Sequence, residues 1–315
     1  MLINRVLFQY VSKFSTKYST VLAWPTIKLD DRSFNPILNW REISTRKSMG
    51  EELTQLPKVK GLILEQEIDS DLPDYSAVNS HGDIIVGEDP GNIKIINQTG
   101  ENKVGKVVEQ CISCISVDKN NNVYVVRWVR TSTEKGYVKS SVLTVLDENY
   151  NVKQDSRRLE FLGTSNNVKI AINKNNNIIM MNFLDSQVYV LDNTGELKHK
   201  FQPGLRYPRS MDISGQDEIM VTFYYDQVVK IYSEEGNLKS IIKLPEGHVV
   251  LGLAFHYVIC KIIVLTYLEK KYSYFLLYYT EAGELESTTF FGKRIRGEYT
   301  PCIYSNPSEV VLLLL

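Results

Sequence analysis

Apolar and polar residues alternate in short runs along most of this chain, which is the period-2 pattern of strands with one buried face. Four segments share one arrangement, in which an apolar run leads into a polar turn and then into a second apolar run. These segments are residues 77–86, 116–125, 171–180 and 212–221. A further alternating run and a second turn follow each of them. The pattern therefore predicts repeated units of four short strands.

The second turns show how large each unit is. They end at residues 100, 150, 195, 236 and 283, so the units are 50, 45, 41 and 47 residues apart. Glycine stands at four of these positions, where a positive φ carries no steric penalty. Units of four strands at this spacing are typical of β-propeller blades, because a ring of sheets buries faces that one sheet leaves exposed.

The sequence thus predicts an all-β fold, a six-bladed β-propeller with five complete blades. Residues 300–314 begin a sixth unit that has only its inner strands. Residues 62–68, together with 26–29 or 37–43, are expected to supply its outer strands and close the ring. We divide the chain into a basic N-terminal segment, residues 1–61, which contributes an outer strand to the last blade in this interpretation, and a propeller, residues 62–315.

Two stretches carry a family resemblance. In residues 117–126 and 172–197 an apolar strand is followed by Asp or Asn, a polar turn, a second apolar strand, and then a Val-x-Val-Leu-Asp-x-x-Gly-x-Leu ending in the longer stretch. This unit resembles the NHL repeat, which forms six-bladed propellers, including those of tripartite-motif (TRIM-NHL) proteins. The resemblance covers residues 62–315 and implies a platform that binds protein or RNA. The RING and B-box ligand patterns of those proteins do not occur in this sequence, so we expect no ubiquitin transfer by this chain.

Charge and the N-terminal residues narrow the expected partners and location. With 36 basic and 37 acidic residues the net charge is −1, so contact with nucleic acid would need a local patch, and a protein partner is favoured. Residues 1–29 contain no acidic residue. If that segment is an ordinary start of the chain, we expect a cytoplasmic protein. Alternatively, it is a targeting segment of an organellar protein.

The cysteines and the longest apolar run have simple interpretations. Cys111 and Cys114 form a CxxC inside a strand-like run, where positions three apart point to opposite faces, so we expect free thiols and no zinc site. Residues 249–268 are long enough to span a membrane, but His256 and Lys261 lie near their middle. We expect two buried strands there and no membrane contact.

The candidate binding site lies in loops. Loops that join the second strand to the third, and each outer strand to the next inner strand, open on one face of a propeller. The candidate partner-binding residues are the arginines and large aromatics of these loops: Arg127, Trp128, Arg130, Phe183, Arg206, Tyr207, Arg209, Tyr224 and Tyr225. Such residues are enriched at interface hot spots and also stack on single-stranded nucleic acid. Alternatively, the rings pack between blades and the arginines pair with acidic residues of the same rim, namely Glu88, Asp89, Asp185 and Asp226.

Motifs of catalysis are scarce. No nucleophile elbow, HExxH or P-loop occurs. Asn79, Asp118 and Asn173 recur after inner strands, where they would either ligate a metal ion or cap the following turn, and their repetition favours turns. We therefore expect a monomeric, non-catalytic scaffold without cofactor or metal that binds a protein partner. An RNA-binding propeller and a metal-dependent hydrolase or lyase are the alternatives.

Overall fold

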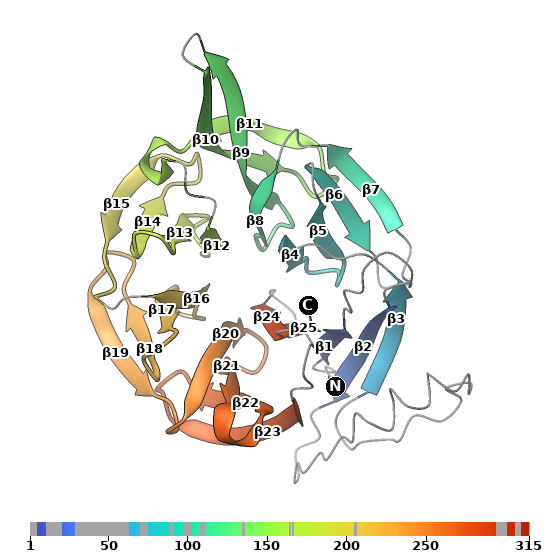
Figure 1. Ribbon diagram of the computed structural model, residues 1–315, viewed down its shortest axis with the longest axis vertical. Helices are drawn as coiled ribbons and strands as arrows, with labels where there is room; N and C mark the ends of the chain where they lie inside the picture. The colour runs from blue at the N-terminus through green and yellow to red at the C-terminus, as the bar shows by residue number, and fades with distance from the viewer. Residues whose placement is uncertain are drawn as a thin grey trace.

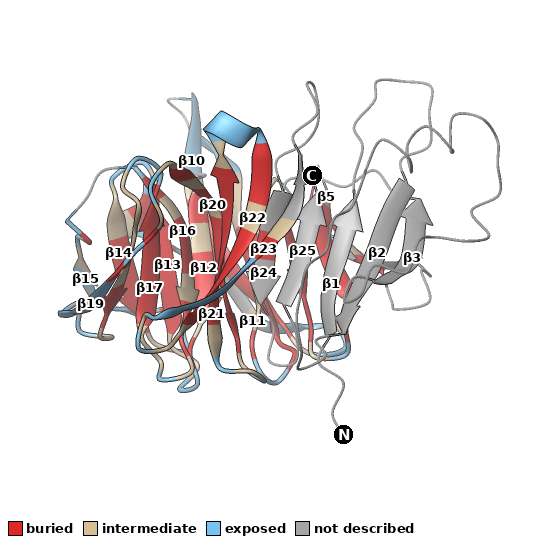
Figure 2. Cartoon of the chain, turned by 90° about the horizontal axis from the view of Figure 1, so that it is seen from below, coloured by how far each residue is buried: buried red, intermediate tan, exposed pale blue. Residues whose placement is uncertain are grey.

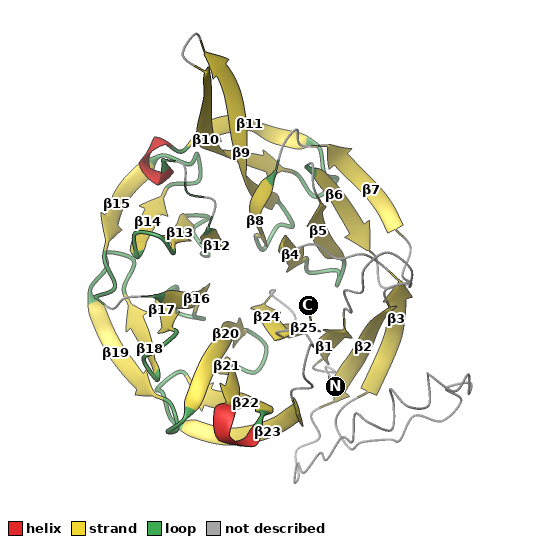
Figure 3. Cartoon of the chain, viewed as in Figure 1, coloured by secondary structure: helices red, strands yellow, loops and turns green. Residues whose placement is uncertain are grey.

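The chain forms a β-propeller, a ring of twisted sheets around a central axis, in the computed structural model (Figure 1). The structure describes residues 5–10, 21–28, 63–69, 75–88, 91–96, 102–107, 111–133, 136–163, 165, 167–204, 207–293, 301–305 and 310–314. Within these residues the helices η1 (Glu160–Leu162) and η2 (Glu269–Lys271) are single turns, and nearly all other regular structure is strand (Figure 3). The all-β propeller prediction is confirmed.

The described strands form five four-stranded antiparallel sheets, which we call blades 1 to 5 in chain order. Blade 1 contains β4 (Tyr75–Val78), β5 (Ile84–Glu88), β6 (Asn92–Ile96) and β7 (Asn102–Val107). Blade 2 contains β8 (Ile112–Val117), β9 (Val123–Thr133), β10 (Gly136–Leu146) and β11 (Val152–Arg158). Blade 3 contains β12 (Val168–Ile172), β13 (Ile178–Asn182), β14 (Gln187–Leu191) and β15 (Leu197–Phe201). Blade 4 contains β16 (Pro208–Ile213), β17 (Ile219–Phe223), β18 (Val228–Tyr232) and β19 (Leu238–Lys243). Blade 5 contains β20 (His248–His256), β21 (Lys261–Leu268), β22 (Ser273–Thr280) and β23 (Leu285–Lys293).

A further sheet joins strands from both ends of the sequence. Its order is β24 (Pro301–Ser305), β25 (Val310–Leu314), β1 (Arg5–Tyr10), β2 (Val21–Lys28) and β3 (Ile63–Asp69). Strand β1 runs parallel to β25, whereas the other neighbours in this sheet are antiparallel. The inner strands of consecutive sheets contact one another from β4 through β8, β12, β16, β20 and β24 back to β4.

The core lies between the blades, and strand β13 shows why its residues are apolar on both faces. Ile178 and Met180 pack into a cluster with side chains of blade 2. The intervening Ile179 and Met181 pack into a cluster with side chains of blade 4. Because successive side chains of a strand point to opposite faces, a blade between two neighbours needs apolar residues at every position of its central strands. Buried residues accordingly fill the blade interiors, and exposed ones line the rim (Figure 2).

Polar side chains fix the turns between the first and second strands, as predicted. The Oδ1 atom of Asn79 accepts hydrogen bonds from the backbone N–H groups two and four residues later, at 3.0 and 2.8 Å. Asp118 and Asn173 accept the corresponding pairs of bonds. Ser214 does the same with its hydroxyl in blade 4. These residues are turn caps.

The second turns also follow the sequence pattern. Gly195, Gly236 and Gly283 have φ values of 80°, 86° and 89°. At Gly236 a Cβ atom would lie 2.5 Å from Cγ of Phe201, so both the backbone angle and the neighbouring ring exclude a larger residue.

The apolar run forms the two strands expected of it, and Cys114 of the CxxC pair lies in a strand. Residues 249–268 form most of β20 and β21, joined by a turn at 257–260. Among the described residues, no helix is long and apolar enough to cross a membrane. Cys114 is buried in β8, Cys111 precedes that strand, and no disulfide joins them. Burial raises the pKa of the Cys114 thiol to about 11, so it is protonated and unreactive at neutral pH.

Candidate binding face

Three predicted aromatic residues occupy the same position in consecutive blades. Trp128 lies within β9, the second strand of blade 2, whereas Phe183 and Tyr224 directly follow the second strands β13 and β17 of their blades. The backbone N–H of each donates to the carbonyl of a residue just before the inner strand of its blade. These bonds join Trp128 to Cys111 (3.1 Å), Phe183 to Asn167 (3.0 Å) and Tyr224 to Tyr207 (2.9 Å). These three residues therefore lie on the same side of the ring in blades 2, 3 and 4. We call this side of the ring the binding face.

Blade 4 carries an exposed group of rings, the tyrosine cluster, made of Tyr207, Tyr224 and Tyr225. Their exposed fractions are 60%, 43% and 73%. Tyr225 meets Tyr207 and Tyr224 edge to face, with ring centroids 5.4 and 4.8 Å apart. The Arg209 guanidinium carbon lies 5.9 Å from the centroid of the Tyr224 ring. Four predicted residues thus form one contiguous surface.

Blade 2 carries a second group. Two cations lie over the Trp128 ring, with the Arg130 guanidinium carbon 5.2 Å and the Lys139 nitrogen 4.5 Å from its centroid. Arg130 and Lys139 face each other across the hairpin of β9 and β10, which projects from the ring (Figure 1). Near its tip Tyr137 is 77% exposed.

The remaining predicted residues have different surroundings. The Nε atom of Arg127 donates to Oγ1 of Thr144 at 3.3 Å, so this side chain is held within its own blade, closer to the packing alternative. Phe183 is half-buried against the core between blades 3 and 4. Arg206 lies outside the described residues. Asp185, one of the acidic residues expected to pair with arginine, accepts a hydrogen bond from the Tyr189 hydroxyl at 2.7 Å.

A cavity of about 610 Å³ lies on the axis of the propeller. Its walls come from the inner strands of blades 1 to 5 and from Ile303 of β24. Most of this wall is apolar, as in β12 and β20, and Phe183 and Arg209 connect it to the binding face. The cavity therefore opens beneath the loops that the sequence singled out.

Polar residues of the cavity were missed by sequence reasoning. Ser76, Lys169, Ser210 and Asp212 stand inside runs that otherwise read as buried strands. The Lys169 nitrogen bonds the Ser210 hydroxyl at 3.0 Å, from one inner strand to the next. The sequence signal that could have indicated this cavity is Lys169, a charged residue in an otherwise apolar inner strand. Within the described part of the chain, no group of three or more His, Cys, Asp or Glu residues is placed to hold a metal ion.

Known protein structures resemble this chain in fold. A protein of unknown function from Bacteroides caccae is similar over 79% of this chain and 90% of its own, with 13% identity and a TM-score of 0.54. A streptogramin B lyase is similar over 75% of this chain and 74% of its own, with 14% identity and a TM-score of 0.53. At these identities the likeness shows a shared propeller fold alone. No protein-family model and no curated protein sequence matches the chain.

Proposed function

We propose that this propeller is a non-catalytic scaffold that binds a protein partner through its binding face. The observation that carries the proposal is the tyrosine cluster, three large rings exposed together beside Arg209. Monomeric proteins rarely expose contiguous apolar surface without using it, and Tyr and Arg are the residues enriched in interface hot spots. The resemblance of the repeats to NHL propellers, an intracellular setting and a monomeric state belong to the same proposal.

The geometry of the rings supports binding at low entropic cost. Each ring has few rotatable bonds, and the edge-to-face contacts at Tyr225 already hold the three rings against one another. A partner that covers them therefore gains apolar contact without ordering a mobile surface. The projecting hairpin with Tyr137 and the Trp128 group offers a second contact region on blade 2.

The test removes the two most exposed rings. Tyr225→Ser shortens one side chain, and Tyr207→Asn removes the other while keeping a residue that tolerates its φ of 60°. Ile241→Ser is the matched control, because Ile241 is 48% exposed on the outer strand of the same blade. Proteins that co-purify with the wild type from nuclease-treated extract are identified, and the dissociation constant of the purified pair is then measured. We expect the double variant to weaken binding by about tenfold or more, and the control to leave it unchanged.

Two outcomes contradict the proposal. One is an unchanged dissociation constant for the double variant, which would place the contact elsewhere. The other is binding that is lost on nuclease treatment, together with a steep salt dependence for single-stranded RNA that is abolished by Arg209→Gln. That result would assign the binding face to RNA.

A further inference from the structure

The central cavity combines apolar walls with an excess of positive charge. Its lining includes Lys119, Lys169, Lys174 and Arg209 but a single acidic residue, Asp212, among the described residues. Ligand pockets of roughly 300–1,000 Å³ are typically apolar with a few polar groups that orient the ligand. The volume of about 610 Å³ and the composition of the wall both fit this type.

The charged groups divide between the two ends of the cavity. The Lys119 nitrogen donates to the carbonyl of Lys174 at 2.7 Å, and the Lys174 nitrogen donates to the carbonyl of Gly215. These bonds tie the turns of blades 2, 3 and 4 together. The Asp212 carboxylate accepts backbone N–H bonds from Phe255 at 2.8 Å and from Ile213 at 2.9 Å. Lys119, Lys174 and Asp212 thus serve the framework at the end opposite the binding face.

Lys169 and Arg209 lie toward the binding face and come from adjacent inner strands, β12 and β16. The Nε atom of Arg209 is buried and has no hydrogen-bond partner among the described residues. On blade 1, Ser76 lines the same cavity, and its hydroxyl is likewise buried without a partner in that part of the structure. Buried polar groups nearly always have partners, so these two groups indicate a missing polar ligand.

We propose that the central cavity binds a small organic carboxylate, whose head lies between Lys169 and Arg209 and whose apolar body lies against the inner strands. A carboxylate can accept hydrogen bonds from Arg209 Nε and from the Lys169 ammonium, and charge-assisted bonds of this kind are the strong ones. The walls contributed by β12 and β20 are mostly apolar, and the charged groups at the far end, Lys119, Lys174 and Asp212, are engaged in bonds to the backbone, so the body of the ligand is expected to be apolar. This site shares Arg209 with the protein interface proposed above but does not include the tyrosine rings, so small molecules test the cavity separately from the tyrosine cluster.

The experiment measures binding of matched probes to the intact chain by titration calorimetry at low salt. The probes are 3-phenylpropionate, octanoate, the neutral analogue 3-phenylpropionamide, and inorganic phosphate. We expect both carboxylates to bind about tenfold or more tightly than the amide, because loss of one charge-assisted bond has roughly this effect on affinity. Phosphate should neither bind with comparable affinity nor displace the carboxylates.

Variants locate the head group. Lys169→Met and Arg209→Gln should each weaken carboxylate binding by about tenfold and leave the weak binding of the amide unchanged. Lys243→Met is the control, since Lys243 is an exposed lysine on the outer strand β19. Unfolding curves establish that each variant is folded. If Lys169→Met does not fold, carboxylate binding is measured with Arg209→Lys in its place.

Several results would overturn the proposal. These are absence of carboxylate binding at millimolar concentration, equal affinity for carboxylate and amide, or unchanged affinity in both cavity variants. Tight binding of phosphate in place of the carboxylates would also overturn it, because it would show an oxyanion site that makes no use of the apolar wall. The interface variants of Tyr207 and Tyr225 should bind the carboxylates like the wild type, which separates the two proposals.

Discussion

His256 at the end of β20 is a histidine with no exposed surface. Burial lowers the pKa of its ring from 6.5 to about 4. The unfolded chain therefore takes up a proton near pH 6.5, whereas the folded chain resists protonation until about pH 4. Because the unfolded state binds more protons in this window, the free energy of unfolding must fall as the pH is lowered through it.

We expect this one group to contribute a loss of up to about 3 kcal/mol between pH 7 and pH 4. Urea unfolding across this range, compared between the wild type and His256→Leu, measures the contribution. The variant should have the flatter pH dependence even if it is less stable at pH 7. Identical slopes for the wild type and His256→Leu would show that His256 does not carry this dependence.

Single residues also show what the sequence could and could not predict. Asn79, Asp118 and Asn173 were predictable as caps because an Asx cap bonds within five residues of its own chain. The surroundings of Arg127 could not be predicted. Its partner Thr144 lies on the neighbouring strand, and the register of the two strands brings the two side chains together. Lys169 was missed because its role depends on a different blade.

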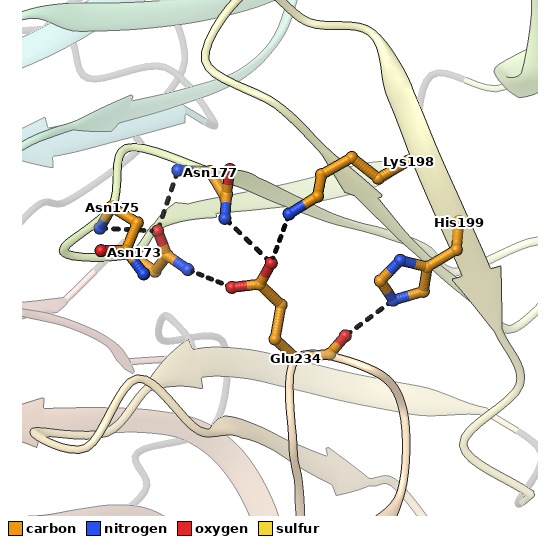
Figure 4. A network of polar contacts seen from close by, with 6 residues as sticks. All are labelled: Asn173, Asn175, Asn177, Lys198, His199 and Glu234. Atoms are coloured by element: carbon orange, nitrogen blue, oxygen red, sulfur yellow. Dashed lines mark hydrogen bonds and ion pairs between the residues drawn. The ribbon is translucent and has the colours of Figure 1, made fainter.

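Hydrogen bonds between turns join neighbouring blades. Among the described turns, those of blades 3 and 4 share the most such bonds (Figure 4). The Glu234 carboxylate accepts bonds from Asn173 at 2.8 Å, Asn177 at 2.9 Å and Lys198 at 2.7 Å, all from blade 3. Its backbone carbonyl is 2.7 Å from Nε2 of His199. Partial burial raises the pKa of the Glu234 carboxyl, but the bonds from Lys198, Asn177 and Asn173 outweigh it and lower the pKa overall.

The same connection recurs around the ring. Glu281, at the matching position in the turn of blade 5, accepts a bond from Gln216 of blade 4 at 3.0 Å. In blade 2 the Tyr150 hydroxyl lies 3.5 Å from the Asn79 amide of blade 1. The second turns of blades 2, 4 and 5 thus each reach back to the first turn of the preceding blade. The connection at Glu234 differs from these in its ion pair with Lys198 and in the three bonds that its carboxylate accepts.

Glu234→Gln should therefore destabilise the protein. Glutamine offers one oxygen in place of two and removes the charge that Lys198 faces, so we expect a loss of about 1–3 kcal/mol at pH 7. Since the folded pKa lies below the unfolded one, the difference between wild type and variant should shrink as the pH falls below 4.5. Urea unfolding at pH 7 and pH 3.5 measures both effects.

Glu235→Gln is the control for this experiment, because Glu235 is the exposed neighbour in the same turn. It should have little effect on the urea midpoint. A Glu234→Gln midpoint equal to that of the wild type at pH 7 would mean that the bonds of Figure 4 add no net stability.

At the level of the ring, alternation and turn spacing were sufficient to predict the five four-stranded blades, because each blade is built from contacts local in sequence. The order of strands in the sheet that contains both ends was not predictable in the same way. The sequence pattern expected strands at 62–68 and at 26–29 or 37–43, whereas the described strands include β1 at Arg5–Tyr10, which pairs with β25 in parallel. A parallel pair between residues about 300 positions apart leaves no local turn signal.

Whether this sheet closes the propeller stays a prediction, and it can be tested through β1. Leu7 pairs with Val311 of β25 on one side and with Thr26 of β2 on the other, so β1 is internal to the sheet. Proline at an internal strand position removes a ladder N–H and is found essentially only at edges and bulges. Leu7→Pro should therefore lower the Tm by roughly 5 °C or more. Deletion of residues 1–68, which takes away β1 and β2 and most of β3, should lower it further and broaden the transition.

The reason lies in the neighbours of β24. This strand contacts β20 of blade 5 and β4 of blade 1, so it stands where the two ends of the blade series meet. Without β1 to β3 the sheet would keep β24 and β25 alone, and a two-stranded sheet is marginally stable at best. Blades that contact only their neighbours then lose cooperativity from that point outward. A deletion variant that unfolds with the midpoint and steepness of the full chain would show that the five blades are stable without closure by the N-terminal strands.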